Sequence, residues 1–143
     1  MRKEELSDRF TEAWQKIDNL YNAYAKSRGL SFSAIIILEC LDNPNAVYTQ
    51  KELCEKFGLP KQAVNSIIKS FWEQNYVELK EAKDRRNKEM FLTAKGKAYA
   101  KEILEHYQQV ETKTWEYFTP EELQAFTEAM EKYEKSFERV AFS

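Results

Sequence analysis

Glycine, proline, cysteine and histidine are all scarce in this chain of 143 residues, which has 3 glycines, 3 prolines, 2 cysteines and 1 histidine. So little glycine argues against a loop that holds nucleotide phosphates, and neither a GxGxxG nor a P-loop pattern occurs. A single histidine, His106, gives a histidine-based metal site or a Ser-His-Asp triad no supporting partners. Cys40 and Cys54 stand beside apolar positions in separate expected helices, so we expect both to be small buried residues. We therefore expect no metal, no cofactor and no enzymatic activity.

Long apolar runs are missing as well. The longest aliphatic run, residues 34–38, is far shorter than the roughly 20 apolar residues that span a bilayer. The first ten residues contain acidic side chains and lack the hydrophobic core of a secretion signal. Hydrophobic residues make up 43% of the chain and charged residues 32%, which is ordinary for a globular protein. We expect a single cytoplasmic chain with no membrane partner.

What the chain does contain, over residues 49–74, is the signature of two helices joined by a tight turn. Thr49, followed three residues later by Glu52, is typical of a capping box at a helix start. Gly58 suits the left-handed residue after a helix end, and Pro60 suits the first position of the next helix, where its missing N–H costs nothing. Two short helices joined so closely must cross steeply, which predicts a helix-turn-helix whose second helix covers residues 60–74.

This second helix has an apolar stripe on one side and a polar face on the other. The stripe has helical spacing and consists of Val64, Ile67, Ile68 and Phe71. The polar face consists of Lys61, Gln62, Asn65, Ser66 and Lys69. No carboxylate interrupts this face before Glu73, although the chain has 24 acidic residues against 22 basic ones. Amides, hydroxyls and cations read base edges and bind phosphates, so the face predicts DNA recognition; an ordinary solvated helix is the alternative.

A basic hairpin is expected directly after the helix-turn-helix. Residues 77–80 and 88–92 show partial strand alternation, and a turn rich in lysine and arginine separates them. A hairpin in this place is a wing, and a basic tip suits the narrow, electronegative minor groove of DNA. Residues 47–97 carry eleven basic and seven acidic side chains, so positive charge is concentrated here despite a net charge of −2 for the chain.

Long amphipathic helices are expected at both ends of the chain. The first has apolar residues in alternating steps of four and three, at Leu6, Phe10, Ala13, Ile17, Leu20 and Tyr24. Thr93 and Thr119 are expected to cap two further helices, the last with a similar stripe at Leu123, Phe126, Met130, Tyr133, Phe137 and Val140. One small winged lobe cannot cover all these stripes, whereas a two-fold dimer can; a helical layer within a monomer is the alternative.

The order of these elements, together with Asp84-x-Arg86 in the turn and Leu92-Thr93-x-x-Gly96 after it, resembles the MarR family of winged-helix transcription regulators over about residues 6–140. The resemblance implies that helix 60–74 enters the major groove, that Arg86 reaches into the minor groove, and that Asp84 orients the wing. It also implies dimerisation through the terminal helices. The expected fold of residues 1–143 is mainly α with a small β part (α+β): a winged helix-turn-helix lobe over residues 31–97, and a helical dimerisation region over residues 1–30 and 98–143.

Aromatic residues, at 14% of the chain, suggest a site for a small effector. Many MarR-like repressors bind small phenolic or aromatic acids in a cleft between the dimer helices and the DNA-binding lobe. The residues that we expect to line such a cleft are Tyr21, Tyr24, Phe32 and Tyr107. Aromatic residues at helical spacing also pack as core, which is the alternative for all four.

The sequence thus predicts a homodimeric, ligand-responsive repressor that binds a pseudo-palindromic operator in double-stranded DNA. The alternative is a winged-helix module that binds a partner protein and no DNA. The expected DNA contacts are Lys61, Gln62, Asn65 and Ser66 in the major groove, Lys69 on a phosphate, and Arg85 and Arg86 on the wing.

Overall fold

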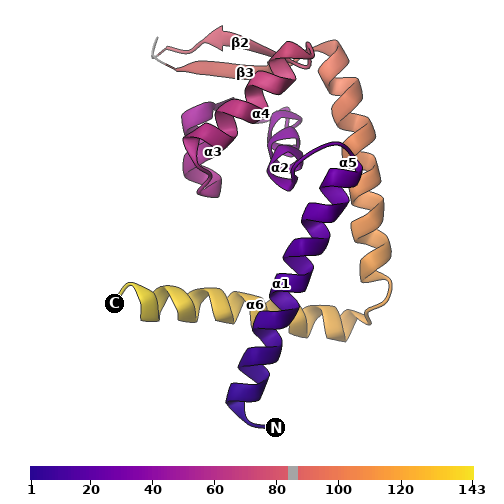
Figure 1. The fold of residues 1–143 in the computed structure, drawn as a ribbon, viewed down its shortest axis with the longest axis vertical. Helices are drawn as coiled ribbons and strands as arrows, with labels where there is room; N and C mark the ends of the chain where they lie inside the picture. Colours follow the sequence, from indigo (N-terminus) through magenta and orange to yellow (C-terminus); the bar gives the residue numbers. More distant parts are fainter. Residues whose placement is uncertain (84–86) are drawn as a thin grey trace. The chain divides into compact units, whose positions relative to one another are not determined.

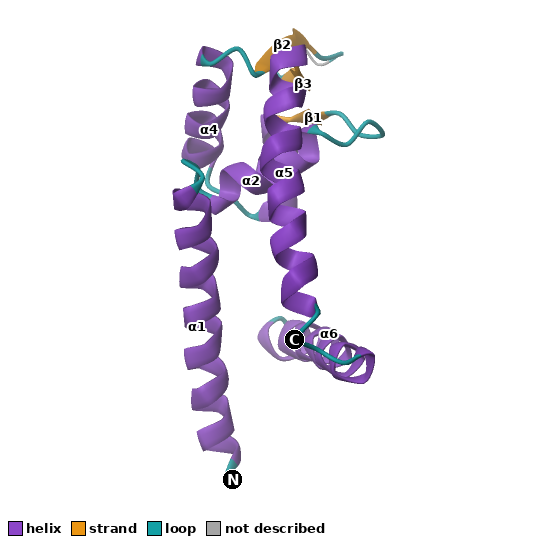
Figure 2. Cartoon of the chain, turned by 90° about the vertical axis from the view of Figure 1, so that its right-hand side faces the viewer, coloured by secondary structure: helices purple, strands orange, loops and turns teal. Residues whose placement is uncertain are grey.

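The computed structural model describes residues 1–83 and 87–143, which form six helices and a three-stranded antiparallel sheet (Figures 1 and 2). The expected mainly helical α+β fold is confirmed. The chain divides into two compact units, Met1–Leu104 and Glu105–Ser143. The elements are α1 (Lys3–Ser27), α2 (Phe32–Leu41), β1 (Tyr48–Thr49), α3 (Gln50–Phe57), α4 (Lys61–Glu73), β2 (Val77–Glu81), β3 (Lys88–Leu92), α5 (Ala94–Trp115) and α6 (Pro120–Ala141).

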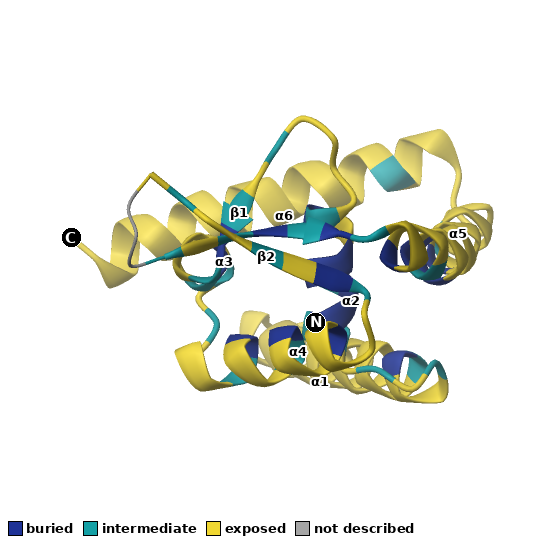
Figure 3. Cartoon of the chain, turned by 90° about the horizontal axis from the view of Figure 1, so that it is seen from above, coloured by how far each residue is buried: buried dark blue, intermediate teal, exposed yellow. Residues whose placement is uncertain are grey.

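The core of the first unit is built around α2. Ser31 caps this helix, since its Oγ accepts a hydrogen bond from the Ala34 N–H at 3.1 Å. Because α2 is apolar nearly all round, it is buried on several sides, and Ile35, Ile37 and Leu38 are completely covered (Figure 3). The inner faces of α4 and the sheet complete this core with Val64, Ile68, Phe71, Val77 and Met90.

The helix-turn-helix forms where it was expected, with two local differences. The Thr49 hydroxyl accepts a hydrogen bond from the Glu52 N–H at 3.2 Å, but it also donates to the Glu52 carboxylate at 3.1 Å, whereas a capping box would bring that carboxylate to the Thr49 N–H. Gly58 is left-handed as predicted, with φ 61°. Pro60 is the N-cap rather than the first helical residue, because its ψ of 139° is extended, and α4 therefore begins at Lys61.

The sheet has the strand order β1–β3–β2, so β2 lies at one edge and pairs with β3. The register places Val77 opposite Leu92 and Glu81 opposite Lys88. The predicted wing is confirmed. A short strand, β1, pairs with it and starts at Tyr48, which lies opposite Met90.

A tight junction joins the end of α4, the start of β2 and the start of α5. The Thr93 hydroxyl donates to the Asn75 carbonyl at 2.6 Å and accepts from the Gly96 N–H at 2.9 Å, while the Thr93 N–H donates to the Tyr76 carbonyl at 3.0 Å. The Tyr76 ring stacks on Tyr99 of α5, with ring centroids 4.2 Å apart and planes 3° from parallel. A Cβ atom added to Gly96 would overlap the Tyr76 carbonyl oxygen. The close approach of the two backbones therefore requires glycine at this position.

In the second unit, α6 begins at the predicted cap, Thr119, which forms a capping box with Glu122. The Glu122 N–H donates to the Thr119 Oγ1, and the Thr119 N–H donates to the Glu122 carboxylate, both at 3.1 Å. The apolar stripe of α6 is exposed within the chain, as its colouring in Figure 3 shows. None of the described helices has both the length and the apolar character needed to cross a membrane.

Replacing Gly96 with alanine should lower the free energy of unfolding by roughly 2–4 kcal/mol, because the new methyl group meets backbone rather than a movable side chain. Thermal and urea unfolding would measure the change. The matched control is Lys97→Ala, the next residue of α5, whose side chain is exposed. If Gly96→Ala were as stable as this control, the junction would be looser than its geometry indicates.

Candidate nucleic-acid interface

Helix α4 presents a continuous polar face to solvent. Its inner side is anchored by Val64, Ile68 and Phe71, each at most 1% exposed, so the rotation of the helix about its axis is fixed. The five residues predicted to contact DNA from this helix are all exposed: Lys61, Gln62, Asn65, Ser66 and Lys69. They lie on one side of a regular helix of 13 residues. This arrangement presents amide, hydroxyl and ammonium groups together, as recognition of base edges and phosphates requires.

The charge on this face is only weakly compensated. The Lys69 ammonium lies 4.0 Å from the Glu73 carboxylate, and both side chains are mostly exposed. An exposed pair at this distance contributes little to stability, so Lys69 remains available to an external anion. Glu73 is also the last residue of α4, so the polar face ahead of it carries no negative charge.

The two strands of the wing flank a segment that includes three of the predicted site residues. Asp84, Arg85 and Arg86 lie outside the described residues. On either side of them, Lys83 and Lys88 are exposed cations. Lys80, on β2, places its ammonium 4.8 Å from the centre of the Phe91 ring across the hairpin.

Lys56, on α3, is a further cation whose position the sequence did not indicate. Its ammonium donates a hydrogen bond to the Tyr48 hydroxyl at 3.0 Å and lies 5.2 Å from the centre of that ring. This hydrogen bond raises the pKa of Lys56, so the side chain stays charged well above neutral pH. The partner lies eight residues away on β1, and only the folded pairing of α3 with β1 brings the two together.

Three of the four aromatic residues predicted for an effector cleft belong to the first unit. Tyr21 and Phe32 are in contact, with ring centroids 4.9 Å apart, which joins α1 to α2. Tyr24, one turn further along α1, is partly buried. Tyr107 is buried and belongs to the second unit, Glu105–Ser143.

Arg28 is a residue near this cluster that sequence reasoning missed. Its Nε atom is buried and has no hydrogen-bond partner among the described residues. Burial raises the pKa of Tyr24, and the positive charge of Arg28 lowers it in part. Burial and nearby Tyr76 and Glu102 likewise raise the pKa of Tyr99, while Arg28 again acts in the opposite direction. The guanidinium is therefore close enough to act on phenols of both α1 and α5.

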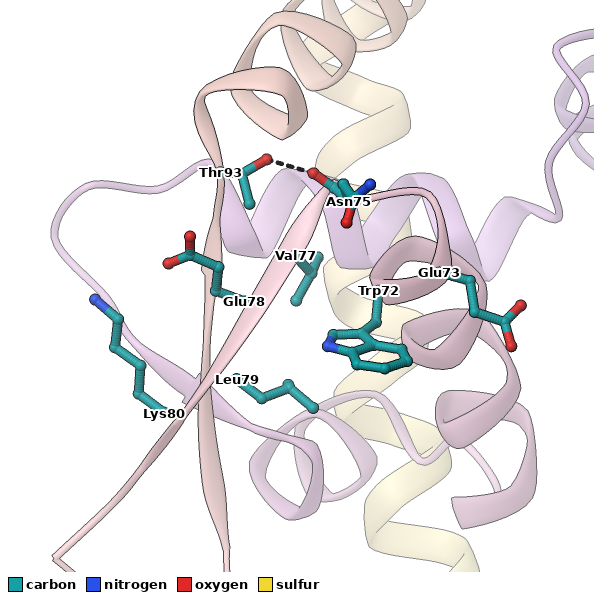
Figure 4. Close-up of a pocket in the computed structure, with 8 residues that line it drawn as sticks. All are labelled: Trp72, Glu73, Asn75, Val77, Glu78, Leu79, Lys80 and Thr93. Atoms are coloured by element: carbon teal, nitrogen blue, oxygen red, sulfur yellow. Dashed lines mark hydrogen bonds between the residues drawn. The ribbon is translucent and has the colours of Figure 1, made fainter.

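A hollow of about 610 Å³ lies elsewhere in the first unit, between the end of α4 and β2 (Figure 4). None of the predicted cleft residues lines it. Trp72 does, and its position seven residues after Asn65 was the sequence signal that it lies on the exposed side of α4. The lining residues are Trp72, Glu73, Asn75, Val77, Glu78, Leu79, Lys80 and Thr93.

Both cysteines have a free thiol. Cys40 is buried as expected, and its burial raises the pKa of the thiol, which disfavours the reactive thiolate. Cys54, on α3, is only partly buried. In residues 1–83 and 87–143, no group of three or more histidine, cysteine, aspartate or glutamate side chains is placed to hold a metal ion.

Comparison with known proteins identifies the winged lobe. The model of the MarR family matches residues 28–87. The structure of NMB1585, a MarR family regulator from Neisseria meningitidis, superposes with a TM-score of 0.77 at 26% sequence identity and covers 94% of each chain. The resemblance of this chain to the MarR family is confirmed. The fold of the chain is that of a DNA-binding transcription regulator, and regulators of this family are not enzymes.

Solved structures of lower sequence identity share the fold. Apo MarR from E. coli superposes with a TM-score of 0.66 at 19% identity, over 93% of this chain and 96% of that one. BpsR from Bordetella bronchiseptica, whose DNA binding is regulated by 6-hydroxynicotinic acid, superposes with a TM-score of 0.70 at 17% identity, over 93% of both chains. No curated protein matches the sequence of this chain.

Proposed function

We propose that this chain acts as a homodimeric repressor that binds a pseudo-palindromic operator and is released by a small aromatic acid. The observation that carries the proposal is the exposed face of α4, which presents two amides, a hydroxyl and two ammonium groups and no carboxylate before Glu73. A face of this composition is better suited to contact with the base edges and phosphates of a major groove than to simple exposure to solvent.

The first two turns of α4 carry the groups suited to base readout. Gln62 and Asn65 each offer a donor and an acceptor on one amide, which matches the N6 and N7 atoms of adenine. Lys61 can donate to guanine acceptors, and Ser66 can pair with either kind of base. Lys69, one turn further along, is assigned to a phosphate, where it would fix the depth of the helix in the groove.

The wing supplies the second set of contacts in this proposal. We assign Arg86 to the minor groove with Arg85 beside it, and Asp84 to the orientation of the wing. The strands that flank these residues are held in a defined register, with Glu81 opposite Lys88. Exposed Lys83 and Lys88 add positive charge on both sides, which favours a surface of negative potential.

Removing either class of contact should weaken DNA binding in a distinct way. Arg86→Ala and Asn65→Ala should each weaken binding to the DNA upstream of the gene that encodes this chain (the upstream region), roughly 5- to 150-fold. Asn65→Ala should also relax the preference for that DNA sequence. Fluorescence anisotropy against that region and a scrambled duplex, at several salt concentrations, would measure both effects. The control is Lys26→Ala, which removes an exposed cation from α1.

Wild-type protein should bind the upstream region more tightly than the scrambled duplex, with an affinity that falls steeply as salt increases. Absence of binding at every salt concentration would support the alternative, a module that binds a partner protein. Unchanged affinity of Arg86→Ala would remove that residue from the interface, even if the protein binds DNA.

Dimerisation is supported by exposed apolar stripes in each of the two units. On α1 the stripe consists of Leu6, Phe10, Trp14, Ile17 and Leu20, all exposed in the single chain. On α6 it consists of Phe126, Met130, Tyr133, Phe137 and Val140, again all exposed. Contiguous apolar surface on this scale marks an interface, and a two-fold dimer is the commonest arrangement that covers it.

A charged residue in the α6 stripe should weaken the dimer. Phe137→Glu places a carboxylate in the centre of a surface that association would bury, and we expect the dissociation constant of the dimer to rise at least about tenfold. Sedimentation velocity over a range of concentrations would measure it. Val47→Glu is the control, because Val47 is an exposed apolar residue outside the terminal helices. A wild-type chain that sediments as a monomer at all concentrations would contradict the proposed dimer.

An effector of the aromatic carboxylic acid class is supported by the cluster of α1 and α2. The contact of Tyr21 with Phe32 offers an apolar surface, and the buried Nε of Arg28 lacks an acceptor that a carboxylate would supply. BpsR, which shares the fold, is itself regulated by an aromatic acid. We propose that Tyr21, Tyr24 and Phe32 contact the ring of the effector, with Tyr107 as a further contact.

Salicylate should weaken operator binding of the wild-type protein, and Arg28→Gln should remove this response because the carboxylate loses its ionic partner. The same anisotropy assay, repeated over a salicylate series, would measure the shift in DNA affinity. Benzyl alcohol, which has the ring without the carboxylate, is the matched ligand control. An aromatic-acid panel without effect would count against this part of the proposal while leaving DNA binding intact.

A further inference from the structure

The strand β2 has one edge that is open to a second chain. In the strand order β1–β3–β2, its one neighbour in the sheet among residues 1–83 and 87–143 is β3. The other edge borders the hollow of about 610 Å³, and four consecutive residues of β2, from Val77 to Lys80, line that hollow. An open strand edge presents backbone donors and acceptors that an extended peptide can pair with.

The register shows which backbone groups point to this edge. Hydrogen bonds from Thr93 N–H to the Tyr76 carbonyl (3.0 Å) and from Ala82 N–H to the Asn87 carbonyl (3.3 Å) lie at the two ends of the hairpin. Paired residues in an antiparallel ladder alternate, so even-numbered residues of β2 direct their backbone groups to β3. Leu79 and Glu81 therefore direct theirs to the open edge, in a strand of five residues.

Apolar side chains form a platform beside this edge. Trp72, at the end of α4, is 55% exposed, and its indole lies on the same side of β2 as the side chains of Val77 and Leu79 (Figure 4). An added strand would continue the alternation of the sheet, so every second side chain would fall on this side. Apolar residues at those positions would cover the indole and Leu79, which otherwise remain in water.

The charged side chains that line the hollow favour a peptide over nucleic acid as its ligand. Glu73 and Glu78 both line the hollow, against one cation, Lys80. The Lys80 ammonium lies over the Phe91 ring at 4.8 Å, across the hairpin. The two carboxylates repel a phosphate backbone, whereas they attract lysine or arginine side chains next to the apolar residues of a strand.

We propose that the open edge of β2 binds an extended basic segment of a partner protein by strand addition, with its apolar side chains over Trp72 and Leu79. This peptide site uses the side of β2 next to Trp72 and does not rest on the proposed function of the chain. It would let a DNA-bound regulator recruit or be held by another protein.

The test uses the full chain, labelled with ¹⁵N, and a capped heptapeptide in which lysine alternates with threonine, valine and leucine. Saturable NMR shifts are expected at the amides of Leu79 and Glu81 and at the Trp72 indole. N-methylation of the alternate peptide amides that face β2 should abolish binding, whereas methylation of the other set should leave it intact, because only one set pairs with the strand. A peptide of the same composition with its lysines grouped together is the control for simple charge attraction.

Two pairs of variants locate the site. Trp72→Ala should weaken peptide binding at least about fivefold, whereas Val47→Ala, which removes another exposed apolar side chain, should not. Glu78→Lys should weaken it as well, and Glu55→Lys, on the exposed side of α3, serves as the matched charge control.

Absence of saturable binding up to about 1 mM peptide would overturn the proposal, since strand addition at a useful affinity lies below that limit. Equal tolerance of both N-methylated peptides would also overturn it. Weaker DNA binding by Trp72→Ala with unchanged peptide binding would assign the hollow to the DNA surface instead.

Discussion

The hydrogen bonds of Thr93 are the constraint on which the DNA-binding lobe depends. One hydroxyl bonds both to Asn75, two residues after α4, and to the first turn of α5, and the adjacent N–H bonds to Tyr76, the residue before β2. The helix α4, the wing and the long helix α5 are thereby fixed to one another at a single point. The stacked rings of Tyr76 and Tyr99 and the absent side chain of Gly96 allow the three backbones to come this close.

Local chemistry made the element boundaries predictable from the sequence. Caps at Ser31, Thr49, Thr93 and Thr119 and the left-handed Gly58 act within three or four residues, so their patterns are visible in the chain itself. The one-residue error at Pro60 arose because proline tolerates both the N-cap and the first helical position. The polar face of α4 was equally visible, because helical spacing alone places its residues together.

Contacts between distant segments were not predictable in the same way. The bond of Lys56 to Tyr48, the stack of Tyr76 on Tyr99 and the buried Nε of Arg28 each depend on how two elements pack, and no periodicity encodes them. The hollow beside β2 was missed for the same reason, although the spacing of Trp72 placed it outside the core.

The requirement for glycine at position 96 has a consequence for how a signal can travel in this molecule. With backbone against backbone and no side chain between them, the first turn of α5 and the start of β2 have no room to slide past each other. They can move only as one rigid piece. A tilt of the first turns of α5, whatever its origin, must therefore turn the wing through the same angle, and in a two-fold dimer the change would appear twice, as a new distance between two DNA-reading surfaces.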